Sequence, residues 1–201
     1  MVLREFIRRV LNEAAFGIND IPEGHIIVIK SLGAADTVIK LVDLRADPAS
    51  SRPLGEIGIH KPDTADGPCD GAWVVATSHA VKGWGPVLYD LAIEYATQNA
   101  NGLVPDRATV SSGALRVWNH YMNQRPDVQA FQLDDMRNTL TPVNRDNAEQ
   151  ESAVDDAYST ADREKLVNNP KAFTMSSLSK RYTKKPVTIN ALKDARKLRI
   201  E

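Results

Sequence analysis

A short glycine loop, Gly83-Trp84-Gly85, is the part of the sequence whose residue types point most directly to chemistry. It follows an apolar, β-branched run and precedes a segment with helical spacing, so the sequence predicts a strand, a tight loop and a helix. The N–H groups of such a loop meet the positive end of the helix dipole, which favours a phosphate or pyrophosphate. A tight turn that binds no ligand is the alternative.

The segment after this loop has the pattern of an amphipathic helix. Pro86 falls in its first turn, where the missing N–H costs no helical hydrogen bond. Four apolar residues recur at intervals of three and four: Leu88, Leu91, Ala92 and Tyr95. Asp90 and Glu94 are therefore expected on the opposite, polar face. The Walker and dinucleotide-binding patterns are both excluded, because the Gly-Lys-Ser/Thr of the first and the third glycine of the second are missing.

Composition narrows the class of protein. The chain has 201 residues, of which 42% are hydrophobic and 25% charged, as in an ordinary globular domain. A net charge of −1 argues against a polyanion-binding protein. Cys69 is the only cysteine and cannot form an internal disulfide. No apolar run reaches the roughly 18 residues of a membrane span, so a cytoplasmic or virion location is expected.

Charge divides the chain into two parts. Residues 134–164 carry nine acidic residues against three arginines, whereas residues 176–201 carry eight Lys and Arg against two acidic residues. Few large apolar residues lie between 134 and 165. We therefore expect a domain over residues 1–133 and a charged C-terminal arm with short helices over residues 134–201.

The order of predicted elements indicates an α+β fold with helices on a largely antiparallel sheet. The predicted strands are His25–Ser31, Thr37–Leu44, Leu54–Ile59, the strand at Trp73, Gly102–Val110 and Asp127–Leu133. The predicted helices are Val2–Ala15, the one after Pro86, and Gly113–Asn123 capped by Ser111 or Ser112, followed by short pieces at Ala161–Val167 and Ile189–Leu198.

A family resemblance rests on two stretches. HAVKGWGPVLYDLAIEYA resembles the coenzyme A loop of the GNAT superfamily of N-acetyltransferases, and the element order over residues 24–133 is similar to that fold. GLVPDRATVSSGALRVWNHYMNQRPDV is similar to GNAT-like proteins of tailed bacteriophages, and the N-terminal LREFIRRVL also looks typical of phage proteins. The resemblance covers about half of the chain. It implies two central strands that diverge beside the loop.

The family loop Arg/Gln-x-x-Gly-x-Gly/Ala falls on residues 80–85. Both glycines match, but Ala80 stands where a basic or amide residue is expected. The resemblance implies that five residues hold the pyrophosphate of acetyl-CoA: Val81, Lys82, Gly83, Trp84 and Gly85. Trp84 either covers the cofactor or anchors the helix, and Trp73 and Trp118 are expected in the core.

A later family pattern, Asn-x-x-Ala-x-x-x-Tyr, falls on Ser111, Ala114 and Trp118. The resemblance implies that Ser111 contacts the cofactor through its hydroxyl. An indole is not an acid at physiological pH, so the proton for the departing thiolate has to come from elsewhere. Tyr121 is the nearest candidate.

The reaction that the resemblance implies also needs a base for the acceptor amine. His79, at the end of the strand, has the right residue type and place; a histidine bonded to a backbone carbonyl is the alternative. Glu56 and His60 share a strand parity and can face the same cleft, or they lie on a solvated sheet edge. His25 and His120 have no partners at metal-ligand spacing, so no metal is expected.

Two functions follow, and the choice between them is open. The first is an acyl-CoA-dependent N-acyltransferase of phage origin, using acetyl-CoA and an unidentified amine. The second is a catalytically inactive GNAT-fold protein that forms homo-oligomers or binds virion partners through its C-terminal arm. Contact of the basic segment Lys180–Arg199 with nucleic acid is a weaker third reading, and membrane binding is not expected.

Overall fold

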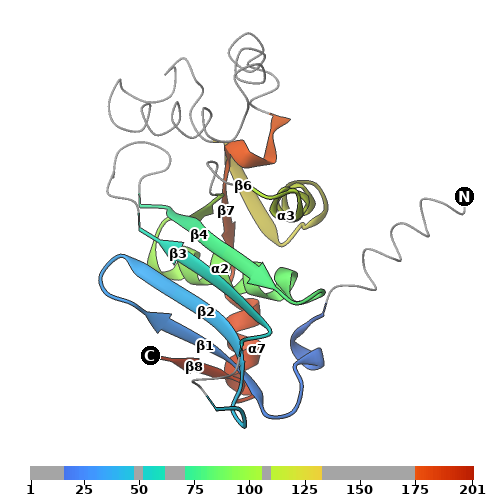
Figure 1. Ribbon diagram of the computed structural model, residues 1–201. Coiled ribbons are helices and arrows are strands. Elements are labelled where there is room, and N and C mark those ends of the chain that lie inside the picture. Colours follow the sequence, from blue (N-terminus) through green and yellow to red (C-terminus); the bar gives the residue numbers. More distant parts are fainter. Residues whose placement is uncertain (1–15, 48–51, 62–70, 106–109, 133–174) are drawn as a thin grey trace, which may run out of the picture. The chain divides into compact units, whose positions relative to one another are not determined.

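The computed structural model describes residues 16–47, 52–61, 71–105, 110–132 and 175–201 (Figure 1). The predicted helix Val2–Ala15, the piece Ala161–Val167 and Cys69 lie outside these ranges. The fold is mixed α+β, as predicted, with an eight-stranded, mostly antiparallel sheet in the order β6-β7-β5-β4-β3-β2-β1-β8. Among the described residues there are three α-helices.

Among the described residues up to 132, the elements follow the sequence patterns, although the strand predicted over Gly102–Val110 is described only at Leu103–Val104. The strands there are β1 (His25–Ser31), β2 (Asp36–Asp43), β3 (Gly55–His60), β4 (Trp73–Ala80), β5 (Leu103–Val104) and β6 (Val128–Gln132). The helices are η1 (Ile18–Asp20), α2 (Gly85–Asn99) and α3 (Ser112–Gln124). The predicted bounds of β1, β2, β3 and α3 are thus confirmed to within one residue.

The C-terminal segment completes the sheet. It contains η2 (Ser177–Ser179), β7 (Lys180–Lys184), α7 (Val187–Asp194) and β8 (Leu198–Ile200). β7 lies between β5 and β6 and pairs antiparallel with both, and β8 pairs in parallel with β1. The prediction that residues 177–201 form an arm apart from the sheet is therefore wrong, whereas the short helix predicted at Ile189–Leu198 is present as α7. The charged residues of this segment concealed the pattern, because Tyr182 is the only large apolar side chain of β7.

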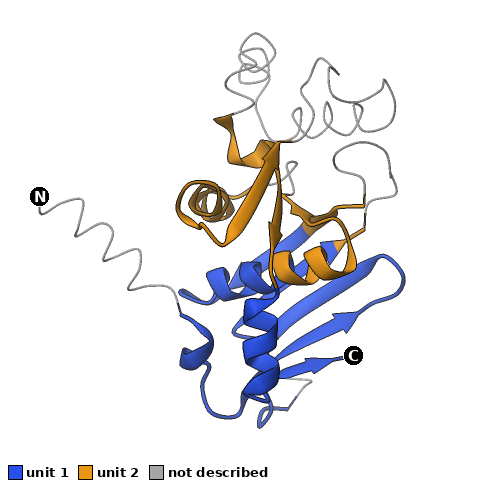
Figure 2. Cartoon of the chain, turned by 180° about the vertical axis from the view of Figure 1, so that it is seen from behind, with its two compact units in different colours: residues 1–59, 76–92, 186–201 blue, residues 60–75, 93–185 orange. Residues whose placement is uncertain are grey.

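The chain divides into two compact units (Figure 2). Unit 1 comprises residues 1–59, 76–92 and 186–201, and unit 2 comprises residues 60–75 and 93–185. The chain passes from one unit to the other within β4 and within α2, so neither unit is a continuous segment.

Unit 1 is built on the β1–β2 hairpin, which pairs from His25↔Asp43 to Ser31↔Thr37. Alternate residues of β1, β2 and β3 are buried on one side: Ile27, Ile29, Ile39, Leu41, Ile57 and Ile59. The first half of α2 and the helix α7 contribute further core residues: Leu88, Leu91, Ala92, Ile189 and Leu192. The period of two in the strands and of three or four in the helices explains why these residues share one core.

Unit 2 is organised around Tyr182 of β7, which is fully buried. Its ring stacks on Trp118 of α3 at a centroid distance of 4.8 Å, and its hydroxyl donates a hydrogen bond to the Ser177 carbonyl at 2.6 Å. Burial raises the pKa of this hydroxyl. Trp73 packs edge-on against Tyr95 at 5.8 Å. The prediction that Trp118 lies in the core is confirmed.

One expectation for α2 is wrong. Glu94 was expected on a polar face, but its side chain is fully buried and pairs with Lys184 of β7. α2 buries residues on several sides, among them Tyr89, Ile93 and Ala96, so it has no wide polar face around Glu94. A hydrophobic period in sequence cannot show that a second set of residues is covered by a distant strand.

Candidate functional site

The predicted strand, loop and helix are present. β4 ends at Ala80 and α2 begins at Gly85, which leaves a four-residue loop from Val81 to Trp84. Gly83 has φ of +98°, a backbone conformation that a side chain would strain. The glycine is therefore required by the tight turn whether or not a ligand binds.

The loop does not offer all the amides that the resemblance implies. The Val81 N–H donates to the Leu54 carbonyl at 2.8 Å, and the Trp84 N–H donates to the Val81 carbonyl at 3.1 Å. Both amides are used inside the protein, so the expectation that they hold a pyrophosphate is wrong. Lys82 and Gly83 of the loop and Gly85 at the start of α2 are the positions left for an anion, and the Lys82 side chain is exposed.

Trp84 is a buried anchor of the loop. Its side chain is 4% exposed, and its ring lies 4.7 Å from that of Phe16. The Phe16 N–H also donates to the Gly83 carbonyl at 3.0 Å. These contacts fix the loop against the segment before η1, which supports the reading of Trp84 as a buried anchor.

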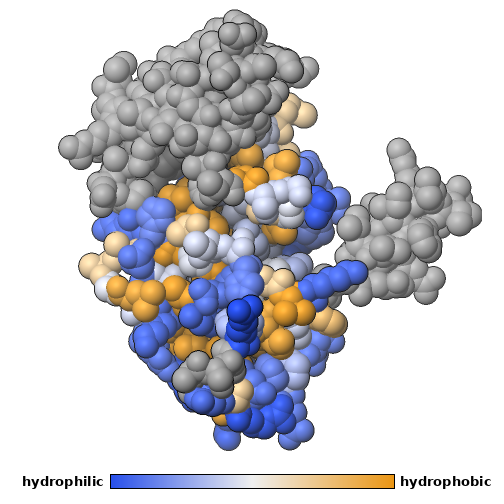
Figure 3. All heavy atoms as spheres, in the orientation of Figure 1, coloured by the Kyte–Doolittle hydropathy of each residue, from blue (hydrophilic) through white to orange (hydrophobic). Residues whose placement is uncertain are grey.

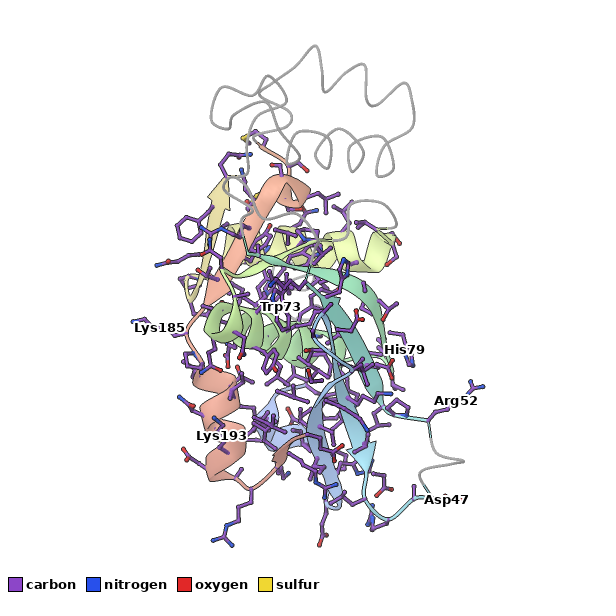
Figure 4. The ribbon with its side chains drawn as sticks, turned by 90° about the vertical axis from the view of Figure 1, so that its left-hand side faces the viewer. Asp47, Arg52, Trp73, His79, Lys185 and Lys193 are labelled. Atoms are coloured by element: carbon purple, nitrogen blue, oxygen red, sulfur yellow. The ribbon has the colours of Figure 1, made fainter. Side chains whose placement is uncertain are left out.

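The C-terminal half of β4 is the most open part of this region. Residues 76–80 are all exposed, and within the described ranges β4 pairs with its parallel neighbour β5 through Trp73↔Leu103 and Val74↔Val104. On its other side β4 lies beside β3. In Figure 4, His79 projects outward from β4, whereas Trp73 lies among other side chains.

One hydrogen bond and two close approaches define the register of β3 and β4. The Val81 N–H donates to the Leu54 carbonyl. Gly55 lies against Ala80 and Gly58 against Thr77, since a Cβ added at each glycine would be 3.0 Å from Ala80 Cβ and 2.8 Å from Thr77 Oγ1. All three fit one antiparallel register, and that register puts Glu56 opposite His79.

In the same register the backbone N–H and C=O groups alternate along β4. The N–H and C=O groups of Thr77 and His79 point toward β3, as the bonded N–H of Val81 does. The N–H and C=O groups of the residues between and before them point away from β3: Ala76, Ser78 and Ala80. The predicted common face for Glu56 and His79 follows from this register.

The two predicted residues are neighbours without being directly bonded. The Glu56 carboxylate forms an ion pair with Lys40 of β2 at 2.9 Å. Within the described part of the chain, no hydrogen-bond partner is found for the His79 ring, so the alternative of a bond to a backbone carbonyl gains no support. The His79 ring is exposed at this surface.

Tyr121 and Ser111 have structural roles in unit 2. Tyr121 is 1% exposed, and the Arg125 guanidinium lies 5.2 Å from its ring centre. Tyr121 thus packs inside unit 2, and its burial gives no support to the prediction that it is the acid. Ser111 is the N-cap of α3 and accepts a hydrogen bond from the Ala114 N–H at 3.2 Å. This bond uses its hydroxyl oxygen as an acceptor.

Two groups escaped the sequence analysis. The Ser78 hydroxyl on β4 lies 3.0 Å from the Tyr89 hydroxyl on α2, within unit 1. In unit 2, Lys184 contacts Glu94 and lies 3.8 Å from Asp127, whose carboxylate accepts two hydrogen bonds from Arg125 at 2.8 and 2.7 Å. The Arg125 hydrogen bond lowers the pKa of Asp127. Arg125 and Asp127 flank Pro126 in sequence, but no local signal links Glu94 to Lys184.

Many cations of the basic C-terminal segment are engaged inside the protein. Lys184 is buried with Glu94, Arg181 donates to Asn101 Oδ1 at 2.8 Å, and Lys197 donates to the Ile21 carbonyl at 2.6 Å. Arg199 pairs with Glu201 at 3.6 Å. In the surface view of Figure 3, polar and apolar residues are interspersed over the described part of the face. The segment is thus a structural part of the sheet.

The described residues show neither a metal-binding cluster nor a membrane-spanning helix. There, no group of three or more His, Cys, Asp or Glu side chains could hold a metal ion. No helix in these ranges is both long and apolar enough to cross a bilayer. Comparison with protein-family models, with curated proteins and with solved structures found no match.

Proposed function

We propose that the protein is an acyl-CoA-dependent N-acyltransferase of the GNAT superfamily and that the exposed end of β4 binds the acyl-CoA. One observation carries this proposal: among the described residues, the parallel neighbours β4 and β5 share two residue pairs, after which β4 continues to Ala80 with its side chains exposed. A parallel pair that ends early beside a glycine loop is what the resemblance implies.

The backbone of β4 supports a role in binding. The N–H and C=O groups of Ala76, Ser78 and Ala80 point away from β3, so they can pair with the amide groups of a pantetheine arm. The exposed Lys82 and the N-terminus of the fifteen-residue helix α2 supply positive potential for a pyrophosphate. Because Val81 and Trp84 use their amides internally, this cradle is smaller than the resemblance alone implies.

The side chains at this end of β4 support amine acylation. His79 takes a proton from the acceptor ammonium, and Glu56, across the strand pair, stabilises the resulting imidazolium. The free amine attacks the thioester carbonyl, the C–S bond breaks, and the thiolate takes up a proton. The exposed Ser78 hydroxyl on β4, which lies 3.0 Å from the Tyr89 hydroxyl, is a described group at this end of the strand that can pass a proton to the thiolate.

Titration calorimetry with acetyl-CoA tests the binding step. Lys82→Ala should weaken binding about tenfold, the loss expected for one phosphate contact worth about 1.4 kcal/mol. Lys193→Ala, an equally exposed lysine on α7, is the matched control and should bind as the unaltered protein does. An absence of binding by the unaltered chain contradicts the proposal.

A second candidate function is a GNAT-fold protein that binds without catalysis, as a virion component or another assembly protein. The internal use of the Val81 and Trp84 amides and the burial of Tyr121 favour it. Release of free coenzyme A thiol from acetyl-CoA, measured across a panel of small amines and lysine peptides, distinguishes the two. Binding without thiol release for every acceptor supports the second.

A further inference from the structure

β6 is the last strand of the sheet on its side, and no described strand lies beyond it. Its sequence, VQAFQ, contains neither a charge nor a proline, although natural edge strands are commonly protected by one or the other. The strand at the opposite end of the order, β8, is only three residues long and carries Arg199 in an ion pair with Glu201. Of the two outer strands among the described residues, β6 is therefore the one without a protecting charge.

An aromatic ring is held in place at this edge. Phe131 is 41% exposed, and the Arg181 guanidinium lies over its ring at 4.5 Å from the centroid. Arg181 is fixed in turn by its hydrogen bonds to Asn101. An ordered, exposed aromatic on an uncharged edge favours addition of a further strand.

We propose that β6 pairs antiparallel with β6 of a second copy of this chain, about a two-fold axis at Ala130. Ala130 is the middle residue of the strand, so this register pairs all five residues of β6. Val128 then lies opposite the partner's Gln132, and Gln129 lies opposite the partner's Phe131. Even-numbered residues of one copy lie opposite even-numbered residues of the other, and odd-numbered opposite odd-numbered. Each face of the sheet therefore continues into the partner.

The same register makes β6 complementary to itself. The two Phe131 rings lie at diagonal positions on one face, about 7–8 Å apart at the backbone, within reach of each other. No charged residue of β6 faces another, because the strand has none. The small Ala130 side chains on the axis allow close approach. The strand is thus complementary to itself.

Light scattering coupled to size-exclusion chromatography over a wide concentration range tests the proposal. The full chain should show twice its 22.1 kDa mass. Phe131→Glu keeps a partner for Arg181 within each copy but sets two carboxylates diagonally across the axis, so it should give the single-chain mass. Ile200→Glu, at an exposed apolar position of β8, is the matched control and should leave the dimer intact. Circular dichroism and the unfolding midpoint verify that each variant folds.

Cross-linking tests the register itself. Ala130→Cys in a Cys69→Ser background should form a disulfide-linked dimer under mild oxidation, because directly opposite residues have Cα atoms about 4.5–5.5 Å apart, as a disulfide requires. Ile200→Cys in the same background should stay unlinked. A single-chain mass at every concentration overturns the proposal. A dimer that persists in the Phe131→Glu variant and is not cross-linked through Ala130→Cys overturns the proposal as well.

Discussion

Glu94 of α2 and Lys184 of β7 form an ion pair whose side chains are 0% and 3% exposed. The pair joins residues 90 positions apart in sequence within unit 2. The Lys184 N–H also donates to Thr97 Oγ1, on the next turn of α2, at 3.1 Å. β7 is thereby fixed to α2 by both its backbone and its side chain.

Removal of one partner should be far more damaging than removal of both. Lys184→Met leaves the Glu94 carboxylate buried without its cation and should lower the free energy of unfolding by about 3–5 kcal/mol. The double variant Glu94→Leu/Lys184→Met replaces the pair by apolar groups of similar size and should recover much of that loss. Urea unfolding of the two single variants and the double variant measures the coupling. Additive losses would contradict a direct interaction.

Gly102 should be intolerant of a side chain. It has φ of +107°, and a Cβ there would lie 2.6 Å from the Tyr182 carbonyl oxygen. Gly102→Ala should therefore lower stability by more than about 1 kcal/mol. Gly33 has φ of +121° but open space where a Cβ would lie, so Gly33→Ala measures the backbone strain without a steric clash. It should lower stability less than Gly102→Ala does. Gly85→Ala meets no atom within 4 Å and should be close to neutral in thermal unfolding.

The N-cap of α3 distinguishes two adjacent serines. Ser111 accepts the Ala114 N–H, whereas Ser112 is already the first residue of the helix. Ser111→Ala should lower the free energy of unfolding by about 1 kcal/mol, and Ser112→Ala should change it little. Chemical denaturation of the two variants in parallel gives the comparison. Equal losses at both positions would contradict the cap assignment.

Asp127 should make stability depend on acid pH. Its folded-state pKa is lowered by Arg125, so the carboxylate contributes stability above the unfolded value of about 3.9 and loses it as pH falls through the folded pKa. Asp127→Asn should be less stable than the unaltered protein at neutral pH, and the difference should shrink in acid. Arg125→Met should flatten the same profile, since it removes the group that lowers the pKa. Unfolding midpoints across the acid range measure both.

His79 should control turnover if the proposed activity is present. His79→Gln removes the proton acceptor, and kcat/KM should fall by about 10²–10⁴ with acetyl-CoA affinity unchanged. Glu56→Gln should have a smaller effect in the same direction, because Glu56 acts through His79. Tyr121→Phe should retain activity, since the Tyr121 hydroxyl lies in a buried part of unit 2. A loss with Tyr121→Phe that matches the loss with His79→Gln would contradict the assignment.

Local patterns predicted much of this fold. The strand alternation of β1 to β3, the cap at Ser111 and the strand-loop-helix at Gly83 all depend on neighbours within a few residues, and each is present. The predictions that failed depend on distant neighbours. Tyr121 and Trp84 have side chains that suit either a site or a core, and burial alone decided between these roles.

The sequence by itself determined the α+β class, the hairpin strands and the glycine loop, because period, capping and turn chemistry are written within single elements. Only the tertiary structure decided that β7 lies between β5 and β6, that Glu94 is buried, and that Val81 and Trp84 use their amides inside the protein. The physical reason is the same in each case. Whether a polar group meets water, a ligand or another part of the chain depends on segments that fold against it from far along the sequence.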